Sequence, residues 1–303
     1  MPPSPAPEKV LQRLDWHVVR RLDGLLQGEY RSLFRGPGLD LAGLREYQPG
    51  DDIRYIDWNV TARTTAPYVR EYHEDREITA WFLLDLSPSV DFGTVGAPGD
   101  ERRKRSVLVD FVTTLARVLT RRGNRIGAMV DDGLGVRIIP VASGRLAVLR
   151  LVDQLLQRPL PDHAPATDLG VLLEAATRTL KRRSLVVIVS DFISEPGWER
   201  PLHLLNQRHE LLAVRLVDPR ERELPDLGLV LVEDAETGEQ LEIDTGDRAY
   251  RERFARAAVD REQAVESAFG RAGVEVLTLS TDDDLVRAIV RMATSRRRRR
   301  ALP

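Results

Sequence analysis

The sequence contains no cysteine among its 303 residues. Disulfides, thiolate nucleophiles, cysteine zinc sites and iron–sulfur clusters are therefore excluded. Aromatic residues make up only 6% of the chain, and the formal net charge is −2, so nothing in the overall charge points to nucleic acid or a membrane surface. The longest apolar runs, residues 81–84 and 185–189, have the length of strands and fall well short of the roughly 20 residues that cross a bilayer.

Several functional motifs are missing as well. The first residues lack the basic start and apolar stretch of a signal peptide, and we expect a cytoplasmic protein. No G-x-x-x-x-G-K-[ST] loop is present, so the chain is not itself a P-loop ATPase. The five histidines form no H-E-x-x-H motif, and no serine lies in a G-x-S-x-G turn.

From residue 78 onward, strand-like and helix-like patterns alternate. The predicted strands are 78–85, 125–130, 135–141, 184–190, 210–217 and 274–279, and the predicted helices are 104–122, 144–157, 169–180, 198–208, 247–272 and 283–292. The strands 125–130 and 135–141 are joined by a short turn and are expected to form an antiparallel hairpin. The remaining alternation predicts an α/β fold, a mostly parallel sheet with helices on both faces.

Polar residues follow the two most apolar predicted strands. Asp85, Ser87 and Ser89 end the first, and Asp191 follows the second. Thr167 precedes a predicted helix between them in the chain. Because ligands of such sheets bind outside the carboxyl ends of the strands, we expect these five side chains to share one site.

Two carboxylates and three hydroxyls form a set of hard oxygen ligands suited to Mg²⁺ or Mn²⁺. In an octahedral shell the hydroxyls can bind directly while Asp85 and Asp191 hold waters, which leaves a position open. Each residue also has a structural explanation: Asp85 and Ser87 can form a turn after a strand, and Thr167 can cap the helix that begins at Asp168. The combination of all five favours a metal site.

The aspartate–x–serine–x–serine spacing resembles the metal-ion-dependent adhesion motif of von Willebrand factor A domains. In that family a threonine from a second loop and an aspartate after the fourth strand complete the site, positions that Thr167 and Asp191 match. The resemblance implies a Rossmann-like sheet of order 3-2-1-4-5-6, and a partner's carboxylate on the metal. The sequence departs from the pattern at Pro88, at Val90 and at Phe192, where many relatives carry glycine.

A second, wider resemblance begins upstream. Residues 38–58, GLDLAGLREYQPGDDIRYIDW, resemble the hallmark of the bacterial domain-of-unknown-function family number fifty-eight, and the similarity continues through 62–63 and 69–71. With the metal loops, it covers most of the chain from about 35 to 292. The resemblance implies a partner of the MoxR-type AAA+ ATPase class, by analogy with other A-domain proteins in chaperone or cofactor-insertion systems.

The hallmark segment mixes aromatic and aliphatic residues with charges of both signs. It could be a structural ion-pair network that pins the segment to the A domain, or a docking surface. The residues concerned are Glu46, Asp51, Asp52 and Asp57, which could pair with Arg45, Arg54 and Arg63.

We expect five regions. Residues 1–34 hold a disordered start and an N-terminal helix over 8–27, and 35–76 form the hallmark segment packed on the A domain. The A domain spans 77–294 with an inserted hairpin at about 219–246, and 295–303 form a basic disordered tail.

The function predicted from these features is a non-catalytic, divalent-metal-dependent protein-binding module, an adaptor or co-chaperone for a MoxR-type AAA+ ATPase. One alternative is a hydrolase that activates water on the same metal. A second alternative is a scaffold that binds its partner without metal.

Overall fold

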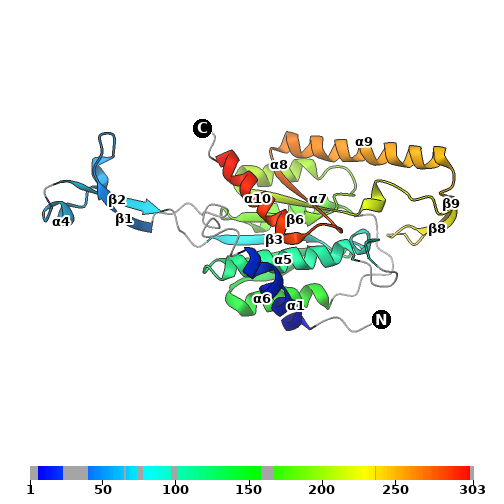
Figure 1. Cartoon of the computed structure of the whole chain (residues 1–303), viewed down its shortest axis with the longest axis horizontal. Coiled ribbons are helices and arrows are strands. Elements are labelled where there is room, and N and C mark those ends of the chain that lie inside the picture. The colour runs from blue at the N-terminus through cyan, green and yellow to red at the C-terminus, as the bar shows by residue number, and fades with distance from the viewer. Residues whose placement is uncertain are drawn as a thin grey trace.

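The computed structural model describes residues 6–22, 40–64, 66–73, 78–96, 102–157, 167–235 and 237–300. At its centre is a six-stranded sheet of order β10-β7-β6-β3-β4-β5 (Figure 1). The strands are β3 (Thr79–Asp85), β4 (Arg125–Asp131), β5 (Val136–Ser143), β6 (Leu185–Ser190), β7 (Glu210–Val217) and β10 (Glu275–Ser280). Numbered from β3 as the first strand of the sheet, this is the order 3-2-1-4-5-6, so the predicted α/β fold and topology are confirmed.

All neighbouring strands of the sheet are parallel except β4 and β5, which form the expected antiparallel pair. The two central strands, β3 and β6, are the most apolar, and every residue of β6 is buried. Parallel strands that are covered on both faces need this near-continuous apolar sequence. Their carboxyl ends, Asp85 and Ser190, therefore meet at one edge of the sheet.

Helices cover both faces of this sheet (Figure 1). One apolar cluster joins the sheet to α1 (Pro7–Leu14), α5 (Lys104–Thr120), α6 (Gly144–Leu156) and α10 (Leu285–Arg300). A second cluster joins the opposite face to α7 (Leu169–Thr179), α8 (Glu199–Arg208) and α9 (Arg248–Ala272). The helix ends follow from local chemistry: Asp247 accepts a hydrogen bond from the Ala249 N–H at the start of α9, and Gly273 ends it with a left-handed φ of 65°.

The N-terminal helix was predicted over residues 8–27. In the structure α1 continues into a π-helical turn, Asp15–Val19, and helical backbone extends to residue 22; the rest of the predicted helix lies outside the described residues. Arg117 on α5 donates to Asp15 at 3.0 Å, which fixes this turn against the domain.

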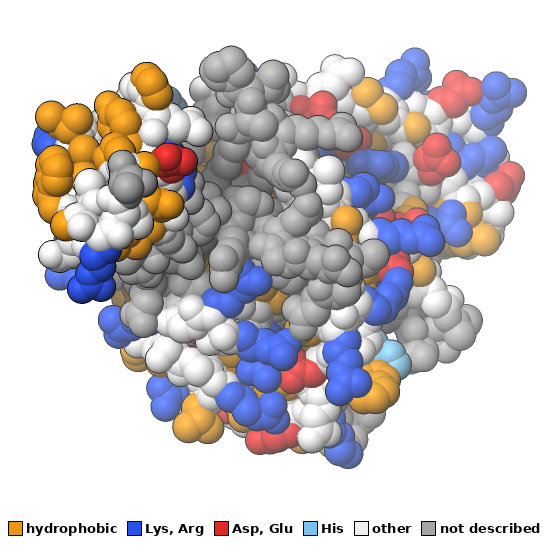
Figure 2. Space-filling view, turned by 60° about the vertical axis from the view of Figure 1, so that its left-hand side comes forward, with side chains coloured by type: hydrophobic (Ala, Val, Ile, Leu, Met, Phe, Trp, Pro, Cys, Tyr) orange, Lys and Arg blue, Asp and Glu red, His pale blue; other side chains and the backbone are white. Residues whose placement is uncertain are grey.

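The hallmark segment forms its own small unit. It consists of β1 (Asp40–Glu46) paired antiparallel with β2 (Tyr68–His73), the short helical turn Ile53–Tyr55, and α4 (Trp58–Thr61). Two ion pairs lie within the segment, Arg45 with Asp51 at 2.7 Å and Arg54 with Asp52 at 2.6 Å. Hydrophobic side chains gather on one part of the surface at the left of Figure 2, and the segment's most exposed ones are Ile53 and Trp58. The packing of residues 35–76 on the domain stays a prediction.

Two segments complete the fold. The inserted hairpin is β8 (Leu229–Glu233) paired antiparallel with β9 (Gln240–Asp244). The last helix, α10, continues to Arg300, so the expectation of a disordered tail is wrong for residues 295–300. Arginine has a high helix propensity, and positive charge is favoured in the last turn of a helix.

We find no helix of the length and apolarity that a bilayer crossing requires in the parts of the chain described above.

Candidate functional site

The five candidate residues come together at the carboxyl edge of the sheet, in two groups. Asp85 ends β3, and Ser87 and Ser89 follow in a tight loop that begins a 3-10 turn, Pro88–Asp91. Thr167 approaches from the residue before the cap of α7, and Asp191 directly follows β6. All but Ser89 are less than 10% exposed.

Asp85 is the centre of the first group. Its Oδ1 accepts the Ser87 N–H at 2.9 Å, and its Oδ2 accepts the hydroxyl of Ser190 at 2.6 Å. The Ser87 and Ser89 hydroxyl oxygens lie 3.0 Å apart. The loop thus holds two hydroxyls beside one buried carboxylate, the spacing that one small cation needs to contact both.

Asp85, Ser87 and Thr167 line one cavity of about 20 Å³. This volume holds one or two particles the size of water. Asp131 and Asp168 line the same cavity, so three aspartates border it. Burial raises the pKa of Asp131, and the charges of Asp132 and Asp168 contribute to the same shift.

Thr167 does not cap α7. Asp168 does so by accepting the Gly170 N–H at 2.9 Å. The structural explanation considered for Thr167, a helix cap, is therefore wrong, since the neighbouring aspartate takes that role.

Asp191 forms the second group with a lysine that the sequence analysis placed only as the start of a helix. Lys104 Nζ lies 2.7 Å from Asp191 Oδ2 and 2.6 Å from Glu221 Oε1. The lysine and Asp191 side chains are each 1% exposed. Burial alone lowers the pKa of Lys104, but the charges of Asp191 and Glu221 outweigh it and the net shift is upward.

The two groups interact electrostatically, because the charge of Asp191 in the second group affects the pKa of Asp85 in the first. Burial raises the pKa of Asp85 to about 6, and the charge of Asp191 adds to this rise, against the hydrogen bonds from Ser190 and Ser87. Asp191 and Glu221 both contact the Lys104 ammonium group, and Asp85, which senses the charge of Asp191, adds a third acidic group at this edge. The edge of the sheet therefore carries an excess of negative charge that a further cation would offset.

The backbone after Asp191 explains one departure from the A-domain pattern. Phe192 has a φ of 58°, the left-handed region in which glycine is favoured. Its ring packs edge-on against Phe269 at 4.7 Å and against Trp198 at 5.5 Å between centroids. Its N–H donates to Ser190 Oγ at 2.9 Å, so packing and a hydrogen bond hold the strained residue in place.

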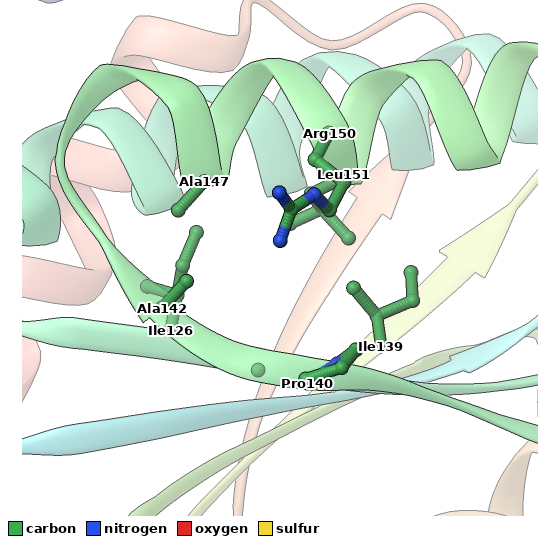
Figure 3. A pocket seen from close by; sticks show the side chains of 8 residues that line it. Ile126, Ile139, Pro140, Ala142, Ala147, Arg150 and Leu151 are labelled. Atoms are coloured by element: carbon green, nitrogen blue, oxygen red, sulfur yellow. The ribbon is translucent and has the colours of Figure 1, made fainter.

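A separate hollow lies between the sheet and α6, where Ile126 and Ile139 point from the sheet toward the helix and Leu151 points from the helix toward the sheet (Figure 3). Its volume is about 10 Å³, the space of a single water, and its lining is mostly apolar. It adds no chemistry to the site.

With this geometry in place, comparison with known proteins decides the family. The family model described as "Protein of unknown function DUF58" matches residues 43–264. The chain belongs to the DUF58 family. Uncharacterized proteins of Mycobacterium bovis and Mycobacterium tuberculosis are each 39% identical to this DUF58 chain over 288 residues, which cover 95% of this chain and 89% of theirs.

Solved structures resemble this DUF58 chain more distantly. BatB from Bacteroides thetaiotaomicron is 13% identical with a TM-score of 0.45, and covers 73% of this chain and 99% of its own. The VWA domain of SpRpn10 is 10% identical with a TM-score of 0.39, over 71% of this chain and 95% of its own. The strand order and directions described above, rather than these scores, carry the fold assignment.

Four polar residues of this edge escaped the sequence analysis: Lys104, Ser190, Asp131 and Glu221. Ser190 and Asp131 had a usable signal, because Ser190 ends the predicted strand 184–190 and Asp131 directly follows the predicted strand 125–130, at the same edge as Asp85. Lys104 and Glu221 had none, since the lysine is 87 residues from Asp191 and 117 from Glu221 in the chain.

Proposed function

We propose that the chain is a protein-binding module whose carboxyl-edge site holds Mg²⁺ or Mn²⁺. One side of the metal's coordination shell would be formed by Asp85, Ser87, Ser89 and Thr167. Asp191 would complete the shell from the opposite side. The metal would then present an open position to a carboxylate of the partner. The observation that carries the proposal is the convergence of Asp85, Ser87 and Thr167 on one small cavity beside the Ser89 hydroxyl.

The chemistry of the residues supports this assignment. Every candidate ligand atom is an oxygen, the donor type that Mg²⁺ and Mn²⁺ prefer. Asp85 is buried with a raised pKa, which indicates a carboxylate without enough positive charge nearby. Asp191 Oδ2 faces Lys104 and its Oδ1 accepts the Ile193 N–H at 2.9 Å, so this residue fits a role through water rather than by direct contact.

The proposed partner is a MoxR-type AAA+ ATPase, for which the chain would act as an adaptor or co-chaperone. Family membership is the basis for this part of the proposal. The role needs no catalytic group in the chain itself: binding a carboxylate through a metal requires only the oxygen ligands and an open coordination position.

The proposal is tested by thermal unfolding of the full chain during titration with Mg²⁺ into the millimolar range. A ligand that binds only the folded state stabilises it by about 2.7 kcal/mol at a hundredfold excess over Kd. We expect a rise in melting temperature for the wild type and for Asp153→Ala, a control on α6, and none for Asp85→Ala. An equal rise in Asp85→Ala, or none in the wild type, would contradict the proposed site.

The partner is tested separately. Binding of a MoxR-type ATPase to the wild type should be lost in EDTA and restored by Mg²⁺, and Ser87→Ala with Ser89→Ala should abolish it. Binding that persists in EDTA would establish a metal-independent scaffold instead.

A further inference from the structure

The inserted hairpin β8–β9 carries a surface that the metal site does not explain. Its two strands pair only with each other in the sheets of the described chain. Leu227, Leu229 and Leu231 alternate along the first strand and its approach, and are 68%, 68% and 66% exposed. Leu229 and Leu231 lie two residues apart within β8, so they point to one face of the strand and form one exposed row. Leu227 precedes the strand, beyond Gly228 with its φ of 71°.

The other strand places acids beside this row. Leu229 lies opposite Asp244, and Leu231 lies opposite Glu242, in the antiparallel register. Residues directly opposite one another share a face, so the outer face consists of a leucine row and a carboxylate row about 4.8 Å apart. The reverse face turns inward at its base, where Ile243 is buried.

The charge of this segment has one sign. Between Arg222 and Arg248 the sequence contains nine acidic residues and no lysine, arginine or histidine. Glu239 and Glu242 are exposed, and their carboxylates make no ion pair with any residue of the described chain. The hairpin is therefore both apolar and rich in carboxylates, while Asp226, before the hairpin, pairs with Arg251 at 3.4 Å.

The hairpin is held in a defined shape. At its base the Thr245 hydroxyl donates to the Gly228 carbonyl at 2.8 Å and accepts the Leu227 N–H at 3.0 Å. At its tip Asp234 accepts the Thr237 N–H at 2.8 Å. The exposed leucines are thus presented on a fixed scaffold, which lowers the entropy cost of binding.

The hairpin also lies at the end of the domain that holds the carboxyl ends of the parallel strands and the candidate metal site. It follows β7, and Figure 1 shows β8 and β9 at the end of the molecule to which the parallel strands run. Glu221, eight residues before β8, is ion-paired to Lys104, which in turn contacts Asp191. A partner whose carboxylate reaches the metal would pass close to this surface.

We propose that the outer face of the β8–β9 hairpin docks a basic amphipathic helix of the protein partner. An apolar stripe of such a helix would cover the leucine row, while lysines or arginines on one flank would reach the carboxylates of Glu242 and Asp244. A helix is about 10 Å wide and so spans both rows. The inference rests on the proposed protein-binding function and adds the chemistry of the partner segment.

The test uses the full chain and a fluorescent synthetic peptide of about 14 residues, roughly four helical turns, with leucine at helical spacing and lysine elsewhere. Binding is followed by fluorescence anisotropy in EDTA. Leu229→Ser with Leu231→Ser should weaken binding about tenfold or more, because two leucines lose their burial. Glu242→Lys, which reverses a charge on the outer face, should weaken binding at low salt and less at high salt.

Matched controls are Leu146→Ser on α6 and Glu266→Lys on α9, both at exposed positions, which should bind the peptide like the wild type. A peptide of the same composition with strict alternation of leucine and lysine should bind at least about tenfold more weakly, since its apolar side chains do not form a helical stripe. Equal binding by the hairpin variants, an equal loss in the controls, or no binding by the wild type would overturn the proposal. So would a wild-type dimer that the paired leucine substitutions dissociate, because the face would then bind a second copy.

The proposals for the metal site and for the hairpin can be refuted independently. The leucine variant should keep the Mg²⁺-induced rise in melting temperature, and Asp85→Ala should keep peptide binding. If the wild type binds the peptide but is not stabilised by Mg²⁺, only the metal proposal is refuted. If Mg²⁺ stabilises the wild type but the peptide does not bind, only the docking surface is refuted.

Discussion

Replacing Lys104 with methionine is expected to destabilise the protein in the absence of metal. The lysine is 1% exposed and contacts Asp191 and Glu221 at 2.7 and 2.6 Å. Methionine fills a similar volume without the charge, so the substitution leaves Asp191 buried without its ammonium partner while Asp85 still repels it. Loss of one partner from a buried ion pair costs about 3–5 kcal/mol.

The charge balance of the site sets a second expectation for the same variant. Without Lys104, the attraction between the remaining carboxylates and a divalent cation increases. Added Mg²⁺ should therefore raise the unfolding free energy of Lys104→Met by more than it raises that of the wild type. The double variant Lys104→Met with Asp191→Asn should recover most of the lost stability, because the unpaired charge is removed.

The assay is urea unfolding in EDTA and in saturating Mg²⁺, with Lys181→Met as a matched control at an exposed position. The control should stay within about 0.5 kcal/mol of the wild type. A loss below about 1 kcal/mol for Lys104→Met, or no recovery in the double variant, would refute the account of this ion pair.

Two further predictions concern residues around the same edge and the opposite end of the sheet. Gly93→Ala would place a Cβ 2.4 Å from the Arg102 carbonyl oxygen and the Arg103 Cα, so the start of α5 must shift. Urea unfolding should show that the free energy of unfolding falls by about 2–3 kcal/mol. A decrease under about 0.5 kcal/mol would contradict this contact. His209 is buried, and burial lowers its pKa below 6.5, so the unfolded chain takes up a proton first and stability should fall as the pH drops below 6.5. His209→Phe should reduce that fall between pH 7.5 and 5.5, and an unchanged pH profile would count against it.

The sheet could be predicted because its signals are local. The runs that became β3 and β6 are apolar throughout, and a strand buried on both faces requires such a run. The order of the strands came from the resemblance to A domains and matches the structure. The hairpin was visible from two short apolar stretches around a Thr237-Gly238 turn.

Side-chain partners were harder to predict, since they depend on contacts distant in sequence. Thr281, just before the predicted helix 283–292, donates its hydroxyl to Asp218 at 2.7 Å, and Asp284 caps α10 by accepting the Val286 N–H. The Lys104 ion pairs were invisible for the same reason. The site residues that follow β3 and β6 could be predicted, because residues that directly follow neighbouring parallel strands lie at the same edge of the sheet.

The most direct test of the proposed metal site is to soak crystals of the full chain with Mn²⁺ and to locate the metal in an anomalous difference map. We expect one peak within about 2.2 Å of the Ser87 and Ser89 hydroxyl oxygens, beside Asp85 and Thr167. The peak should be absent from crystals of Asp85→Ala. A map without a peak at these hydroxyls, or one whose peak stays there in Asp85→Ala, would contradict the proposed metal site.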